Sequence, residues 1–239
     1  MNGADRPGDL RETRDRELVR AQKLAAGLTV VAILMALLAL FGPQPNDQLL
    51  ALLVALPLLA IIFVVASRNL FRIGLGTGPA QANLAAACAL AACALFARTL
   101  LDLNLITWLP LTAFAAAVAT VFLVVTARRE PNLRRRWWRL LLAGVIVGAY
   151  AFGVLGQFDL RLDRTPPAVL RSRVLDKHPS HPRMATYRVT LAPWGPFNAP
   201  TDATVPQMLY EQLEIGDSAC VRLHDGALGM AWYTVMACR

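Results

Sequence analysis

Two histidines three residues apart form the pattern in this chain that most resembles a metal site. They lie in the segment His178-Pro179-Ser180-His181-Pro182. Together with Asp176 or His224, two imidazoles could bind zinc or copper. The prolines predict a surface turn, however, and the sequence offers no evident third and fourth ligand. We therefore expect neither a metal nor another cofactor, with His178, His181 and His224 as the candidate ligands if a metal does bind.

The sequence contains no recognisable catalytic motif. The chain has neither the Gly-x-Ser-x-Gly of a hydrolase nucleophile nor the His-Glu-x-x-His of a metalloprotease. Its C-terminal acidic residues show no spacing that would pair two carboxyl groups for acid–base catalysis. The sequence thus favours a protein that is not an enzyme, and a membrane-tethered enzyme stays an alternative.

Four cysteines divide into two pairs. Cys88 and Cys93 lie in an alanine-rich apolar run, and Cys220 and Cys238 lie near the C-terminus. A disulfide between the second pair would stabilise a small domain by about 3 kcal/mol. A two-residue turn at Asp225-Gly226 would place Cys220 opposite Ala231, and a five-residue loop would place it opposite Thr234. Neither register reaches Cys238, so the sequence leaves this disulfide open.

Composition indicates a membrane protein. The chain of 239 residues is 56% hydrophobic and 17% charged, whereas soluble domains average about 45–50% apolar and about 25% charged. The excess lies in long apolar runs, as expected for membrane-spanning helices. A cytoplasmic segment, residues 1–23, precedes a five-span domain, residues 24–158. The five predicted spans are residues 24–41, 48–66, 80–97, 106–126 and 140–158.

A basic and aromatic stretch orients these spans. It reads Arg134-Arg135-Arg136-Trp137-Trp138-Arg139 and contains no acidic residue. Such clusters stay on the cytoplasmic side while tryptophans lie at headgroup depth, so the stretch should contact anionic lipid. If the alanine-rich third run did not cross, residues 127–139 would face outward with six arginines. We therefore predict five crossings of a bacterial inner membrane, with the N-terminus cytoplasmic and the C-terminal domain periplasmic or extracytoplasmic.

Two further patterns concern the spans themselves. Arg98 and Asp102 follow the third span at helical spacing and predict an interfacial ion pair that reaches water. A proton or ion path is the functional alternative. In the fifth span, Gly144, Gly148 and Gly153 provide small residues that allow helices to approach closely. We interpret them as packing within the bundle, and a dimer face as the alternative.

Residues 159–239 predict a separate β domain. Apolar runs end there, prolines cluster, and Tyr187, Val189 and Leu191 alternate with polar residues as in a half-buried strand. We expect a small all-β barrel or roll, SH3-like or OB-like, after the α-helical membrane bundle. The predicted strands are Val169–Leu175, Ala185–Leu191, Ala203–Val205, Ala219–His224 and Gly229–Met236, with a helical turn at Met208–Leu213.

The C-terminal sequence also carries a resemblance. The segments 209–221 and 226–233, with their turn and core residues, resemble uncharacterised bacterial inner-membrane proteins that have several spans and a small C-terminal β domain. The resemblance implies a layout and no activity. We expect a binding or assembly role in the cell envelope, with another envelope protein or the cell-wall layer as partner and no nucleic acid. A transporter or channel subunit is the alternative.

Overall fold

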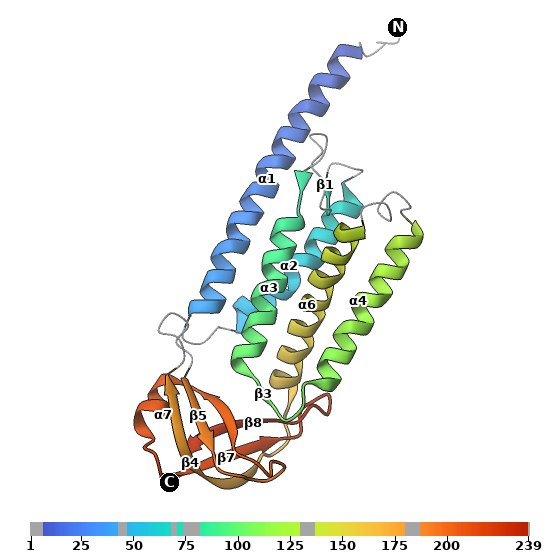
Figure 1. The fold of residues 1–239 in the computed structure, drawn as a ribbon. Coiled ribbons are helices and arrows are strands. Elements are labelled where there is room, and N and C mark those ends of the chain that lie inside the picture. The colour runs from blue at the N-terminus through green and yellow to red at the C-terminus, as the bar shows by residue number, and fades with distance from the viewer. Residues whose placement is uncertain are drawn as a thin grey trace. The chain divides into compact units, whose positions relative to one another are not determined.

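The computed structural model describes residues 7–42, 47–67, 71–73, 82–129, 137–179 and 187–238. Within them, five helices are long and apolar enough to cross a membrane, as the apolar runs predict. Figure 1 shows the elements coloured along the chain. These five are α1 (Pro7–Phe41), α2 (Asp47–Ala66), α3 (Ala85–Asp102), α4 (Leu109–Arg129) and α6 (Trp137–Leu162).

Helix ends differ from the predicted spans where polar residues continue a helix. The third span was expected to end at residue 97, but α3 continues to Asp102. The fifth was expected at residues 140–158, but α6 runs from Trp137 to Leu162. Polar side chains are compatible with helix when neighbouring elements supply hydrogen bonds. As a result, Arg98, Asp102 and Asp159 all belong to helices.

Backbone contacts divide the chain into two compact units. Unit 1 comprises Met1–Leu95 and Ala119–Tyr150, and unit 2 comprises Phe96–Val118 and Ala151–Arg239. The last part of α3, the first part of α4 and the second half of α6 thus belong with the C-terminal strands.

Unit 1 has a small core of its own. Ala21 and Ala25 of α1 are buried with Ala60 of α2 and Phe71. Phe71 lies in β1 (Phe71–Arg72), which pairs in parallel with β2 (Ala82–Asn83). Ala82 of β2 and the following Leu84 are buried in the same cluster. The described parts of the segment between the second and third spans therefore include two short strands.

The β domain in unit 2 contains one sheet of six strands, in the order β3-β8-β7-β4-β5-β6. A short helix, α7 (Gln207–Gln212), lies between β6 and β7 (Figure 1). The described strands are β3 (Asn104–Leu105), β4 (Ala168–Pro179), β5 (Tyr187–Leu191), β6 (Thr201–Val205), β7 (Ser218–His224) and β8 (Trp232–Ala237).

Strand β4 is longer than predicted because it serves two neighbours. Its first half pairs with β7 from Ala168 to Arg173, and its second half pairs with β5 from Val174 to Pro179. The register shifts between Val174 and Asp176, and such a bulge bends a strand. The bend curls the sheet towards a barrel, and Val174 is fully buried inside it.

Two side chains connect edge strand β6 with the other end of this sheet, one from edge strand β3 and one from its neighbour β8. The amide of Asn104 in β3 donates from Nδ2 to the Thr204 carbonyl in β6, at 3.0 Å, and its Oδ1 accepts from the Thr204 amide at 2.9 Å. The Tyr233 hydroxyl in β8 donates to the Asp202 carbonyl at 3.2 Å. The first contact imitates a backbone pair, so a residue between two apolar helices closes the barrel.

The barrel interior follows the period-two pattern of the sequence. Val189 and Leu191 of β5 are fully buried, as are Ala203 of β6 and Val221 of β7. A second cluster joins the helix ends to the barrel through Phe152 of α6. Its other buried members are Leu103, Leu105, Leu111, Ala115, Met230 and Trp232.

Candidate functional site

Polar side chains gather where the ends of α3 and α6 meet the β domain, all within unit 2. We call this group the polar seam. It is the described part of the chain with the densest buried hydrogen bonding between distant residues. Its members are Arg98, Thr99, Asp102, Gln157, Asp159, Asp163, His224 and Trp232.

The α3 side of the seam is the ion pair that the sequence predicts. Arg98 Nε lies 2.9 Å from Asp102 Oδ1, one helical turn away. The Arg98 and Asp102 side chains are only 11% and 19% exposed. The pair is thus formed as expected, but its side chains are mostly buried, with Gln157 of α6 beside Asp102.

Gln157 of α6 lies beside this pair. Its Nε2 lies 3.4 Å from both Asp102 Oδ2 and Thr99 Oγ1, and Arg161 Nε lies 3.4 Å from its Oε1. These separations are long for hydrogen bonds. The Thr99 hydroxyl also donates to the Gly153 carbonyl at 3.1 Å. The network thus links α3 to α6 through amide and hydroxyl groups.

Close approach of the two helices depends on a glycine. A Cβ added to Gly156 would lie 2.3 Å from Thr99 Cγ2 and 3.1 Å from Leu103 Cδ1. Real atoms do not approach so closely, so any larger residue would push α3 from α6. The sequence pattern of small residues four apart does not include Gly156, because Phe152 and Leu160 occupy the positions four residues away.

The end of α6 is fastened to the β7–β8 loop by two carboxylates. Asp159 is fully buried and its Oδ1 accepts from the Leu228 amide at 2.7 Å. Asp163 Oδ2 accepts from the Gly226 amide at 3.0 Å and from the Trp232 indole at 3.2 Å. Gly226 has φ +76°, and a Cβ there would lie 2.6 Å from Asp159 Oδ2. The Asp225-Gly226 turn and the residues after it therefore also bind the C-terminal end of α6.

Where the end of α6 meets the β7–β8 loop, the surroundings favour a charged Asp163 and a neutral His224. Hydrogen bonds from the Thr165 hydroxyl and amide, aided by those from Gly226 and Trp232, hold the pKa of Asp163 below its ordinary value. Burial lowers the pKa of His224, against the attraction of Asp163. The His224 ring stacks on Trp232 with centroids 3.9 Å apart, and its Nδ1 lies 3.8 Å from Asp163 Oδ2.

The polar seam joins the ends of α3 and α6 to the β domain through paired polar groups. Asp102 is paired with Arg98, and Asp163 accepts hydrogen bonds from three residues. Among the residues described, no group of three or more His, Cys, Asp or Glu side chains could hold a metal ion. The arrangement works as a clamp that fixes the barrel to the ends of α3 and α6.

Two of the three candidate metal ligands, His178 and His224, lie apart in the described structure. His178 Nε2 lies 3.4 Å from Asp176 Oδ2, and both side chains are more than half exposed. His181 lies outside the described residues. His224 belongs to the polar seam and pairs with Trp232 at the end of β7. Its neighbour Leu223 pairs with Ala168, which lies ten residues before His178 in β4. A site that joins His178 with His224 is therefore wrong.

Part of the basic stretch is described. Arg134, Arg135 and Arg136 lie outside the described residues. Trp137 and Trp138 begin α6 and are 66% and 51% exposed, and the Arg139 guanidinium lies over the Trp138 ring at 5.2 Å. Exposed indoles at a helix start are suited to headgroup depth.

Glycines of the fifth span pack inside the chain where they are described. A Cβ added to Gly144 would lie 2.8 Å from Leu123 Cδ2 of α4, and the Gly153 carbonyl accepts the Thr99 hydrogen bond. Gly148 lies in the same helix. Two of the three glycines thus serve contacts with α4 and α3.

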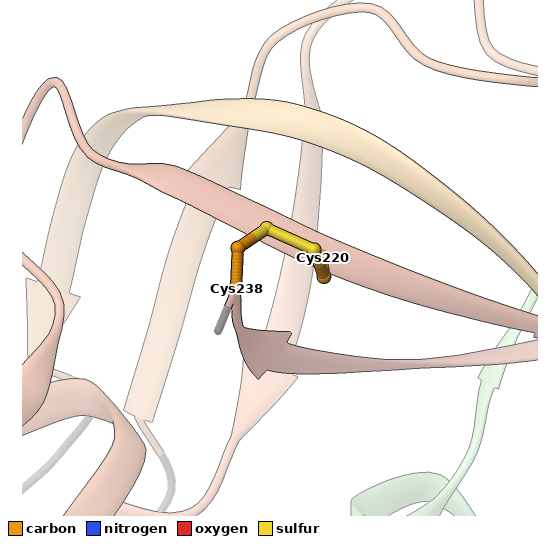
Figure 2. Close-up of a disulfide and its surroundings, with 2 residues drawn as sticks. All are labelled: Cys220 and Cys238. Atoms are coloured by element: carbon orange, nitrogen blue, oxygen red, sulfur yellow. A yellow bond between two sulfur atoms is a disulfide. The ribbon is translucent and has the colours of Figure 1, made fainter.

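Cys220 and Cys238 form a disulfide in the structure (Figure 2). Their Cα atoms are 5.0 Å apart. Both predicted registers are wrong, because His224 pairs with Trp232 and the intervening loop has seven residues, 225–231. Cys220 therefore lies opposite Met236, and Cys238 is its diagonal neighbour. Cys88 and Cys93 are free.

No protein-family model, no curated protein and no solved structure matches this chain.

Proposed function

We propose that this protein is an integral protein of a bacterial inner membrane, with its N-terminus in the cytoplasm and its β domain outside. Five helices of sufficient length and apolarity support the spans. Large apolar side chains on them are exposed, for example Ile62 at 61%, Val121 at 63% and Val145 at 66%. Lipid would cover such side chains. The arginines of residues 127–139 support the orientation.

The disulfide is independent support for the same orientation in the membrane. Disulfides persist in the periplasm and outside the cell, and they are rare in the reducing cytoplasm. Cys220 and Cys238 both belong to the β domain. The free cysteines, Cys88 and Cys93, lie in α3, where a membrane would shield them. The distribution of bonded and free cysteines thus agrees with a domain outside the cytoplasm.

We further propose that the β domain is a binding or assembly module of OB-like topology. Its first strand, β4, bends and pairs with both β5 and β7, and α7 lies between the third and fourth strands. OB-type barrels bind extended oligomers, although a fold alone assigns no ligand. The observation that carries the proposal is the polar seam, because a barrel clamped by Asp159 and Asp163 presents its outer surface in a fixed orientation.

A transporter or channel subunit is the second candidate. The observation that favours it is the buried pair of Arg98 and Asp102 with Gln157. Ionisable groups inside helical bundles mark ion paths in many transporters. This pair lies in the last turns of α3 and its charges satisfy one another, so we rank this function second.

In-cell photo-crosslinking tests the binding role. A photoreactive residue would replace Met208, Val169 or Leu228, which are 73%, 59% and 55% exposed on the β domain. Leu53, fully buried in α2, provides the control position. We expect discrete adducts with an envelope component from at least one β-domain position and none from the control. Absence of adducts at all three exposed positions, in protein of normal abundance, would contradict a binding role.

A further inference from the structure

Three arginines occupy one outer face of the β domain. Arg171 and Arg173 of β4 and Arg222 of β7 are all exposed, and their strands pair with Val169 opposite Arg222 and Cys220 opposite Arg171. Directly opposed residues share a face of the sheet, and so do residues two apart on one strand. We call the three residues the arginine face.

Acidic residues are missing from the strands that form this face. The segments 168–173, 218–224 and 232–237, which make up the paired parts of β4, β7 and β8, contain no Asp or Glu. Within the described chain, the contact of these guanidinium groups is a hydrogen bond from Arg173 Nε to the Gly216 carbonyl at 3.0 Å. None of the three arginines lies directly opposite another, because Arg222 pairs with Val169, Arg171 with Cys220 and Arg173 with Ser218. Three neighbouring cations on one face still repel one another, and an external anion would offset that repulsion.

Spacing indicates the shape of this anion. Side chains two apart on a strand are separated by about 7 Å, and diagonal neighbours on paired strands by about 7–8 Å. Arg222, Arg171 and Arg173 therefore form a row of charges at nearly regular intervals. Guanidinium groups bind phosphate and carboxylate through paired hydrogen bonds. The row suits a linear chain that carries one anionic group every 6–8 Å or so.

The side chains around the arginine face indicate which kind of anionic partner it suits. Protein interfaces centre on buried aromatic or large apolar residues, whereas the aromatic residue of this face in β8, Trp232, is already buried against His224. Membrane-docking faces combine basic residues with exposed Trp or Phe, and the exposed apolar residue in this part of β4 is Val169. A polymer whose affinity depends on charge needs no such anchors.

We propose that the arginine face binds a linear anionic polymer of the cell envelope, with phosphate or carboxylate groups along its chain. The proposal rests on the binding role proposed above and specifies its ligand class. The Cys220–Cys238 disulfide ties β7 to the end of β8 beside Arg171, so the row of charges is held on a rigid base.

Binding of long-chain inorganic polyphosphate and of polygalacturonate to the full chain tests this proposal. The protein would be placed in nanodiscs of phosphatidylcholine alone, so that no anionic lipid competes. We expect at least one polymer to bind with an affinity that falls with salt at a logarithmic slope of about −2 to −3, for three neutralised charges. Phosphate binding and carboxylate binding are distinguished by which polymer is preferred.

Two charge-matched triple variants decide where binding occurs. The first variant should bind at least tenfold more weakly, and it combines Arg171→Gln, Arg173→Gln and Arg222→Gln. The control, Arg20→Gln, Arg128→Gln and Arg188→Gln, removes the same charge from exposed residues elsewhere and should change affinity less than twofold. Equal losses in both variants would show a net-charge effect and overturn the proposal, as would failure of either polymer to bind the wild-type protein. Melting curves verify that each variant is folded.

Phosphatidylglycerol vesicles supply the competing surface. If the arginine face captures vesicles in flotation assays while neither polymer binds, the face is a membrane contact and the polymer proposal is wrong. Polymer binding in nanodiscs does not depend on the orientation of the protein in a cell. A failure here is therefore distinct from a failure of the membrane topology, which a reporter assay measures separately.

Discussion

Asn104 and Thr204, one hundred residues apart, close the β sheet through two hydrogen bonds of 2.9 and 3.0 Å. Asn104 lies between α3 and α4, whereas Thr204 lies in β6, the opposite edge of the sheet. The loop between two apolar helices thus serves as the sixth strand and the clasp of the barrel. The β domain is consequently built from two distant parts of the chain.

Replacing Asn104 should lower the free energy of unfolding of the barrel. Asn104→Ala removes two partly buried hydrogen bonds, each worth about 0.5–1.5 kcal/mol, so we expect a loss of about 1–3 kcal/mol. Thermal unfolding followed by tryptophan fluorescence measures it, since Trp194 and Trp232 are in or beside the barrel core. Asn198→Ala, at an exposed position, is the matched control. Equal melting temperatures for both variants would show that the clasp contributes nothing.

Contact between α3 and α6 should be sensitive to Gly156→Ala. The added Cβ would lie 2.3 Å from Thr99 Cγ2, and overpacking of this kind costs about 1–3 kcal/mol. Adding Thr99→Ser removes that methyl group and keeps the hydroxyl that reaches Gly153, so the double variant should recover most of the loss. Gly27→Ala has no atom within 4 Å of the new Cβ and should melt at or above the wild-type temperature, because alanine favours helix. A double variant no more stable than Gly156→Ala would refute the steric account.

Acidification should weaken the clamp through His224. Burial lowers its pKa in the folded protein, so the unfolded chain binds more protons as the pH falls below about 6.5. Stability should therefore decrease between pH 7 and pH 5.5. Asp163, whose pKa is also lowered, has its full stabilising effect above about pH 3.9 and loses it only in stronger acid. Asp163 therefore does not contribute to the change between pH 7 and pH 5.5.

The variant His224→Phe tests this assignment. Phenylalanine can keep the stack on Trp232 while removing the titrating group. The charged residues that act on His224 are Asp163, Arg222 and Asp225, and all three are unchanged in the variant. Melting temperatures between pH 7.5 and 5.5 should fall less steeply than in wild type. A slope equal to that of wild type would assign the pH dependence to another group.

Thiol labelling should separate the cysteines. In protein taken from membranes without reductant, Cys220 and Cys238 should resist alkylation even after denaturation, whereas Cys88 and Cys93 should react once the chain is unfolded. Cys220→Ser should release one further reactive thiol and lower stability by about 3 kcal/mol, as expected for closure of a loop with this separation of 18 residues. Four reactive thiols in the wild-type protein would exclude the disulfide.

Local pattern predicted the elements better than it predicted their partners. The apolar runs identified all five long helices, and the alternation around Val189 identified β5. Strand β3 was missed because two residues, Asn104 and Leu105, carry no strand pattern of their own. Asp159 and Asp163 were missed because their partners, Leu228, Gly226 and Trp232, are more than sixty residues away. The available signal was the four-residue spacing of Asp159 and Asp163 at the end of the last apolar run.

Reporter fusions test the central claim, that the β domain lies outside the cytoplasm after five crossings, most directly. Alkaline phosphatase, which is active only outside, and green fluorescent protein, which folds mainly inside, would each be fused after Leu162 and after residue 239. Our account predicts phosphatase activity and no fluorescence at both positions, with the reverse for fusions within residues 130–136. Fluorescence without phosphatase activity after Leu162 would contradict it.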